Sequence, residues 1–516
     1  MSLSKTMLVR PLTTPVFSLR LLLGLVAMLA VAGCATLDPE ANRLGPASGP
    51  AKPQSQEPAV PSAGPTTTGI ETRATADQRY VVSLFGGIYR SAATESHLNT
   101  ILAKLAAASE TPQTVYKVTL LNSPAVNAFA LPSGDLFVTR GLLSLANDSS
   151  EIAAVMAHEI GHVAARHAFH REEQQKIEQL RTNVANTVQT KRRGEEIKAT
   201  GLLNLASFSR QQELEADRFG VALIGRAGFD PYGASRFLRS LGRSLEWRTC
   251  QQDSGTQRER VDIMSSHPST PGRIEQAILT ARQIGAPGIG EHGREAYLDA
   301  INGIDYGDDP TDGIVRGTTF THVKLGFTFN APDDFALENC AQAMIGVTPS
   351  RLEAIRLDIV QVPATTSMED YVNTGWVEGL QKSSVQIRTI NGMQGAIAEA
   401  DSNGWKFRVG IVRLNGEVAR IIFAARTMTP ELDQRFVKSI ESFKRLGAGE
   451  TQRVRSLKMA LVTASASDAE SLSRRMAVST RPLDLFLMLN GIQKGKPLDR
   501  GGRYKMISEE DQRDWA

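Results

Sequence analysis

The sequence predicts a multidomain α+β protein with a mainly helical N-terminal half that carries a small sheet with an edge strand. An α+β sheet domain and a small strand-helix-helix-strand unit follow. Three observations support this prediction. The 516 residues exceed what one core accommodates at about 150 residues per domain. Apolar residues recur every three or four positions from about Ala76, which predicts helices, and from about Thr321 they alternate, which predicts strands.

Residues 1–33 have the pattern of a secretory signal. Three basic residues precede the apolar run 21–32, which is shorter than the roughly 20 residues a spanning helix needs. The run ends in VAGC and resembles the lipobox of bacterial lipoproteins, in which the cysteine becomes lipidated; here this is Cys34. The resemblance implies a periplasmic protein with a lipid anchor, and Ala35 favours the outer membrane. The alternative is an ordinary signal peptide with an incidental cysteine.

Residues 34–75 are rich in Pro, Ser, Ala and Gly, so we expect a disordered tether that holds the folded part off the membrane. The net charge of +3 gives no argument for a nucleic-acid partner. Besides Cys34 the chain has only Cys250 and Cys340, which fall in different predicted domains. A disulfide framework is therefore not supported, although one bridge between them stays open.

The first folded domain is predicted over 76–305. After the initial helices, VYKVTLLNS alternates like a strand, and NAFALPSGDLFVTRGLL predicts two short strands around a Pro-Ser-Gly-Asp turn. Asp148 followed by Glu151 predicts the capped start of a helix from Ser149 to about Leu180. Later helices are predicted at about 207–227, within PYGASRFLRSLGRSLEW, and around 273–284.

Two further units are predicted downstream. Alternating strands and a closing helix predict an α+β domain over 310–447, which weakly resembles the small PsbP and Mog1 domains. Residues 452–510 have the order strand, helix, helix, strand and resemble a LysM module, a family that binds peptidoglycan. The usual Gly-Asp-Thr of that family is replaced by Ser467, Asp468 and Ala469, so glycan binding and a packing role both stay open.

The stretch HEIGH, residues 158–162, is the strongest chemical signal. His158 and His162 are four residues apart, so on a helix both project from one face and can bind one metal ion. Glu159 lies beside them, where it can act on a metal-bound water. The surrounding residues make the helix apolar on most sides, which predicts burial, and buried imidazoles and a carboxylate need partners.

A catalytic zinc usually has three protein ligands. In ELEAD, Glu213 and Asp217 are also four apart. We expect Glu213 to reach the metal, and Asp217 to accept a hydrogen bond from a ligand histidine. His167 and His170 are candidates by proximity only, because the longer metzincin spacing is absent. We interpret both as solvated or helix-surface residues.

Together HEIGH, ELEAD, NAFALPSGDLFVTRGLL and SSHPSTPGR resemble the zinc endopeptidase family that includes HtpX, the mitochondrial Oma peptidase and the CAAX prenyl endopeptidase. The resemblance covers about 76–285. It implies a zincin-like metallopeptidase domain with one zinc per chain, held by His158, His162 and Glu213, and with Glu159 as general base. The lipoprotein leader makes the periplasmic, beta-barrel-assembly-enhancing members closest in kind.

Two further hypotheses concern the cleft. The NAFALP segment is expected to form an edge strand that pairs with substrate backbone, with Asn127 and Phe129 on the substrate side. His267, in a Pro-stiffened loop, either occupies the fourth zinc position or stabilises the developing oxyanion, and a plain loop histidine is the alternative.

These patterns predict a lipid-anchored periplasmic zinc endopeptidase that cleaves misfolded or stalled cell-envelope proteins. Its expected partners are unfolded or misassembled envelope proteins, the membrane through the anchor and, through the LysM-like unit, peptidoglycan. The main alternative is an outer-membrane protein assembly chaperone with a structural zinc and little proteolysis. A second alternative is a cell-wall-binding protein that acts through its C-terminal unit.

Overall fold

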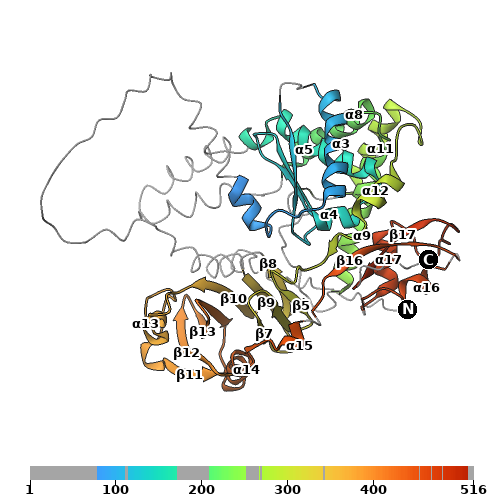
Figure 1. The fold of residues 1–516 in the computed structure, drawn as a ribbon. Coiled ribbons are helices and arrows are strands. Elements are labelled where there is room, and N and C mark those ends of the chain that lie inside the picture. The colour runs from blue at the N-terminus through green and yellow to red at the C-terminus, as the bar shows by residue number, and fades with distance from the viewer. Residues whose placement is uncertain are drawn as a thin grey trace, which may run out of the picture. The chain divides into compact units, whose positions relative to one another are not determined.

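The computed structural model describes residues 78–110, 114–170, 208–251, 267, 270–340, 343–451, 454–465, 468–478 and 480–509. The chain divides into two compact units: one comprises 355–437, and the other 78–354 with 438–509. Each combines helices with sheet, which confirms the predicted α+β multidomain class (Figure 1). Within these ranges no helix is both long and apolar enough to cross a bilayer. The predicted signal peptide, Cys34 and tether lie outside the described residues.

The larger unit begins with a mainly helical part, as predicted. Its helices are α3 (Ala92–Ala108), α4 (Arg140–Leu145), α5 (Ser149–Ala164), α8 (Arg210–Arg226), α9 (Gly233–Gln251), α11 (Pro271–Ile284) and α12 (Arg294–Ile301). The prediction of one continuous helix from Ser149 was wrong, because α5 stops at Ala164; its predicted end at about Leu180 lies outside the described residues. Arg166 has a φ of 52°, a left-handed conformation that an α-helix cannot contain.

A small sheet lies beside these helices, with strands β1 (Lys117–Leu121), β2 (Ala128–Ala130) and β3 (Asp135–Thr139). Its order is β1-β3-β2, so β2 is an edge strand, as the sequence predicted. β1 runs parallel to β3, whereas β2 pairs antiparallel with β3 across the predicted turn.

The same unit continues through β4 (Asp305–Tyr306) into further strands. These are β5 (Ile314–Arg316), β6 (Thr319–His322), β7 (Phe327–Asn330), β8 (Ala336–Cys340), β9 (Ala343–Val347) and the later β15 (Lys444–Arg445). Strands β15-β7-β6-β5 form one sheet, and β8 and β9 pair antiparallel. The short helix α15 (Ala448–Thr451) follows β15.

The smaller unit is built on the antiparallel strands β11 (Gln386–Ile390), β12 (Met393–Ser402), β13 (Trp405–Leu414) and β14 (Glu417–Ala425), next to β10 (Glu353–Gln361). Helices α13 (Met368–Val372), η1 (Lys382–Ser384) and α14 (Pro430–Glu441) complete it. Inside this unit Arg420 and Asp358 form a buried ion pair at 2.6 Å. The predicted boundaries 310–447 and the PsbP and Mog1 likeness stay predictions.

The C-terminal segment has the predicted order β16 (Leu457–Thr463), α16 (Ala469–Ser473), α17 (Pro482–Leu489) and β17 (Arg503–Ser508). β16 pairs antiparallel with β17 and also with β4, so the chain returns to the helical part after more than a hundred residues. Its apolar residues share one core with the helical part, and α17 contacts α9 (Figure 1). The LysM likeness stays a prediction.

Lys505 of β17 is completely buried at the end of α4. Its ammonium donates hydrogen bonds to the carbonyl oxygens of Ser144 at 2.9 Å and Ala146 at 2.5 Å. These carbonyls belong to a helix end, where no backbone N–H is available to them. Burial lowers the pKa of Lys505 to about 7. Lys505 thus satisfies the end of α4 just before the chain turns into α5.

We expect Lys505→Met to lower the free energy of unfolding by about 3 kcal/mol, because it leaves buried carbonyl oxygens without a donor. The loss should also depend on pH. Between the folded pKa near 7 and the unfolded value near 10.4, the unfolded chain binds more protons, so unfolding of the native sequence becomes harder as pH rises, by at most about 1.4 kcal/mol per pH unit. Methionine does not titrate, so the variant lacks this pH-dependent contribution to the free energy of unfolding.

Denaturant unfolding of both proteins at several pH values above about 7 measures the effect. The stability difference should widen as pH rises. A difference that stays constant with pH would contradict a buried Lys505 with a lowered pKa.

Candidate metal centre

The helix that carries HEIGH is buried along nearly its whole length. Every residue from Ser149 to His162 is buried, so His158, Glu159 and His162 are held within the core. The predicted cap of this helix is confirmed: a carboxylate oxygen of Asp148 accepts a hydrogen bond from the Glu151 backbone N–H at 2.9 Å. A buried helix start needs such a partner for its free N–H groups.

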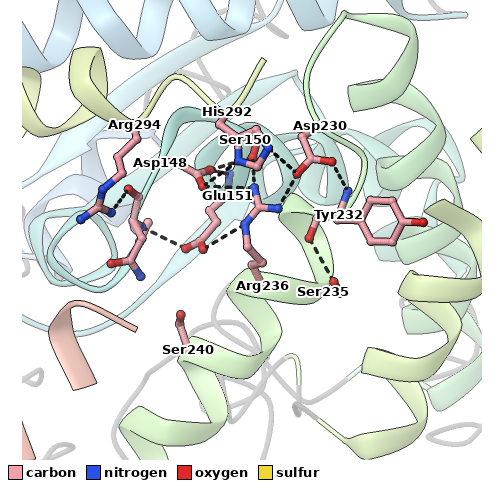
Figure 2. A network of polar contacts seen from close by, with 12 residues as sticks. Asp148, Ser150, Glu151, Asp230, Tyr232, Ser235, Arg236, Ser240, His292 and Arg294 are labelled. Carbon is pink, nitrogen blue, oxygen red and sulfur yellow. Dashed lines mark hydrogen bonds and ion pairs between the residues drawn. The ribbon is translucent and has the colours of Figure 1, made fainter. Parts of the chain in front are cut away.

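An arginine from α9 neutralises the carboxylates at this helix start (Figure 2). Arg236 lies 3.1 Å from an oxygen of Asp148 and 3.7 Å from one of Glu151, and it also pairs with Asp230. Burial raises the pKa of Glu151 to about 7, and the nearby Asp148 adds to this rise. The network fixes the start of α5 against α9.

Four side chains meet at the other end of α5. His158 Nε2 lies 3.0 Å from His162 Nε2 and 3.2 Å from His267 Nδ1. Glu213, on α8, places Oε1 2.8 Å from His267 Nδ1 and 3.6 Å from His162 Nε2. One ligand atom from each of the four lies within 4.8 Å of the others, and all four residues are buried. Among the described residues, this is the one group suited to hold a metal ion.

The chemistry of this donor set fits zinc. Burial lowers the pKa of His158 and His162, which favours the neutral imidazoles that have a lone pair to donate. Three imidazole nitrogens and one carboxylate oxygen are donor types that tetrahedral zinc sites use. Imidazole nitrogens 3.0 Å apart at a shared centre are the arrangement expected around a common ion.

Asp217 and Arg273 support the ligands from behind. Asp217 Oδ1 lies 3.0 Å from His158 Nδ1, on the side of the ring away from the cluster. Arg273 of α11 donates two hydrogen bonds of 2.7 Å to Asp217 and lies 2.7 Å from Glu213 Oε2. Burial alone would raise the pKa of Asp217, but the hydrogen bonds from Arg273 and His158 hold it well below its usual range.

Glu159 points toward the edge strand. Its carboxylate is hydrogen-bonded to the backbone of Ala130, and burial raises its pKa well above the usual range. Oε1 has no hydrogen-bond partner among the described residues and lies 3.7 Å from His267 Nε2. The carboxylate is therefore next to the four-ligand cluster and still has accepting capacity.

The register of β2 explains the contact with Ala130. Leu131 and Thr139 make the flanking hydrogen bonds between β2 and β3, so Phe129 bonds to β3 while Ala128 and Ala130 direct their backbone groups outward. The outward edge of β2 thus faces Glu159. The ring of Phe129 stacks on Phe137 at 5.0 Å, inside an apolar cluster. The ring of Phe129 lies in this cluster and its backbone pairs with β3, so its contact with substrate stays a prediction.

The other predicted residues lie as follows. Asn127 is buried, and its backbone N–H donates to the hydroxyl of Thr139 at 3.0 Å; its predicted contact with substrate stays a prediction. The interpretation of His167 as a solvated residue was wrong: it is 3% exposed, with Nδ1 2.9 Å from His162 Nδ1. His170 is exposed, as expected. Cys340 is exposed and forms no disulfide among the described residues.

Comparison with known proteins agrees with this geometry. Residues 92–280 match peptidase family M48. The Beta-barrel assembly-enhancing protease of Yersinia pestis is 28% identical over 198 residues, which cover 36% of this chain and 39% of that protein. The Mitochondrial metalloendopeptidase OMA1 of Arabidopsis thaliana is 29% identical over 201 residues, 36% of each chain. The chain thus spans about two fifths of the length of these relatives.

A metal in this cluster should stabilise the fold. We expect a strong chelator to lower the midpoint of thermal unfolding, and one equivalent of zinc to restore it. At a free zinc concentration 100 times the dissociation constant, the free energy of unfolding rises by about 2.7 kcal/mol. Calorimetry with zinc titrated into the chelated protein gives both the midpoint and the stoichiometry. A midpoint unmoved by chelation and by zinc would show that the cluster does not hold the metal.

Proposed function

Because residues 92–280 match peptidase family M48, we propose that the protein is a zinc-dependent metalloendopeptidase. His158, His162 and Glu213 are its zinc ligands and Glu159 its general base. The observation that carries the proposal is the position of Glu159, which lies beside the four-ligand cluster and bonds to the backbone of the edge strand.

Each residue then has a definite task. Zinc held by these ligands would polarise the scissile carbonyl and would make a water molecule acidic enough to lose a proton near neutral pH. Glu159 accepts that proton and delivers it to the leaving amine. The outward backbone groups of Ala128 and the carbonyl of Ala130 pair with an extended substrate chain by strand addition, while the N–H of Ala130 bonds to Glu159. Asp217 holds the His158 ring, and Arg273 holds Asp217.

Strand addition recognises main chain rather than particular side chains, so it favours unfolded segments over folded proteins. This preference suits substrates that are misfolded or stalled during assembly in the cell envelope. The predicted lipobox at Cys34 supports a periplasmic location with a lipid anchor, and Ala35 supports the outer membrane. We propose peptidoglycan as a partner of the LysM-like residues 452–510.

We propose that His267 acts as a latch, that is, a residue that occupies the fourth zinc position until substrate displaces it. Its Nδ1 lies within hydrogen-bonding distance of both His158 and Glu213, so it stands where a water or substrate ligand has to bind. A fourth protein ligand closes the position that a catalytic zinc keeps open. In this arrangement the resting enzyme is latent, and substrate binding has to displace His267.

The general base is tested with Glu159→Gln in the full-length chain. The amide has nearly the same shape but cannot accept the proton, so cleavage of an unfolded protein such as casein should fall by about 100- to 10,000-fold. Zinc per chain, measured by elemental analysis, should be unchanged. Equal cleavage by both proteins would refute the role of Glu159, and zinc without cleavage in both would direct attention to latency or to an assembly chaperone.

The latch is tested with His267→Ala, with His170→Ala as control because His170 is an exposed histidine of the same chain. If the open state makes up a tenth or less of the resting population, basal cleavage should rise about tenfold or more. Initial rates on the same unfolded substrate measure the change. Lower activity would favour oxyanion stabilisation by His267, and unchanged activity would leave it as a loop residue.

A further inference from the structure

His162 has a second polar contact on the side of its ring away from the four-ligand cluster. Its Nε2 faces His158 and Glu213, and its Nδ1 lies 2.9 Å from Nδ1 of His167. The other nitrogen of His167, Nε2, lies 3.3 Å from a carboxylate oxygen of Glu215 on α8. His167 is 3% exposed, whereas the Glu215 side chain is 62% exposed. The contacts thus lead from the cluster to the surface.

The backbone beyond α5 is shaped to make this contact. On a continuous α-helix, residue 167 would be rotated about 140° from residue 162 and would point elsewhere. Instead α5 ends at Ala164, and the left-handed Arg166, with a φ of 52°, turns the chain back. A non-glycine residue in this conformation costs roughly 1 to 2 kcal/mol, so the surrounding contacts must offset the cost.

The positions of the protons follow from the metal site. If His162 binds zinc through Nε2, its proton is on Nδ1, and this N–H can donate only to a lone pair. Nδ1 of His167 supplies that lone pair at 2.9 Å. The proton of His167 is then on Nε2, where it donates to the Glu215 carboxylate. In this series of hydrogen bonds from His162 to Glu215, each donor has one acceptor and each acceptor has one donor.

The two ligand histidines therefore have different outer partners. Nδ1 of His158 lies 3.0 Å from a carboxylate, Asp217, which Arg273 holds in place. Nδ1 of His162 meets a neutral imidazole instead. An imidazole is a weaker acceptor than a carboxylate, and the hydrogen bond from His167 to Glu215 strengthens it.

We propose that His167 and Glu215 are positioning residues that fix the tautomer and ring orientation of His162 for zinc binding. This inference rests on the zinc ligands proposed above. Outer partners of ligand histidines typically contribute 10- to 100-fold to metal affinity. The part contributed by Glu215 is smaller than that of His167, because its carboxylate is largely solvated.

The test measures the zinc dissociation constant of the full-length chain by competition with a chromophoric chelator. His167→Phe removes the acceptor but keeps an aromatic ring beside Phe208, which stacks on His162. We expect its affinity to fall 10- to 100-fold. His167→Asn, whose Oδ1 replaces Nδ1 as acceptor, should recover most of the affinity. Glu215→Ala should lose less than about tenfold, and the exposed control His170→Phe nothing.

Circular dichroism confirms that each variant is folded, and Glu215→Ala and His167→Asn keep the test decisive if His167→Phe does not fold. Native affinity in His167→Phe and Glu215→Ala would overturn the inference, as would an equal loss in His170→Phe. His162→Phe separates this failure from that of the ligand assignment. If His162→Phe still binds zinc tightly, the proposed ligand set is wrong; if it does not, only the role of His167 is tested.

Discussion

The burial of α5 is the constraint on which the rest of this structure depends. This helix carries two imidazoles and a carboxylate into an apolar core, where each polar group needs a partner. The surrounding elements supply them. Asp148 and Arg236 satisfy the helix start, Asp217 holds one imidazole, and the edge strand contacts the carboxylate. These partners fix the orientation of the polar side chains that α5 carries into the core.

Helices α5, α8 and α11 come from distant parts of the sequence, and Arg273 connects them electrostatically. It contacts two of the three carboxylates of the ELEAD segment: Glu213, which faces the cluster, and Asp217, which supports His158. A single guanidinium thus offsets part of the negative charge of Glu213 and Asp217, which are both buried. Without it two carboxylates one helical turn apart would repel each other, and their geometry around the histidines would be lost.

The sequence predicted those parts of the site that follow from local periodicity. A spacing of four residues on a helix identified His158 with His162 and Glu213 with Asp217, and alternation identified the short strands. Residues that depend on tertiary contacts were not predictable in this way. His167 is five residues from His162, and on a regular helix two residues at this spacing point in different directions. The left-handed conformation of Arg166, which brings them together, has no signature in the sequence. Arg273 lay in a quoted motif, yet nothing local assigned its role.

The C-terminal segment, residues 454–509, completes the hydrophobic core of the helical part. Lys505 bonds to the carbonyl of Ser144 across 361 residues, and the strands around it pack into the core that also contains α5. A ribosome synthesises the helical part long before β17, so the nascent chain has an unfinished core for most of its translation. Contacts so distant in sequence also form slowly. The core that surrounds α5 is therefore complete only once residues 503–508 have been synthesised.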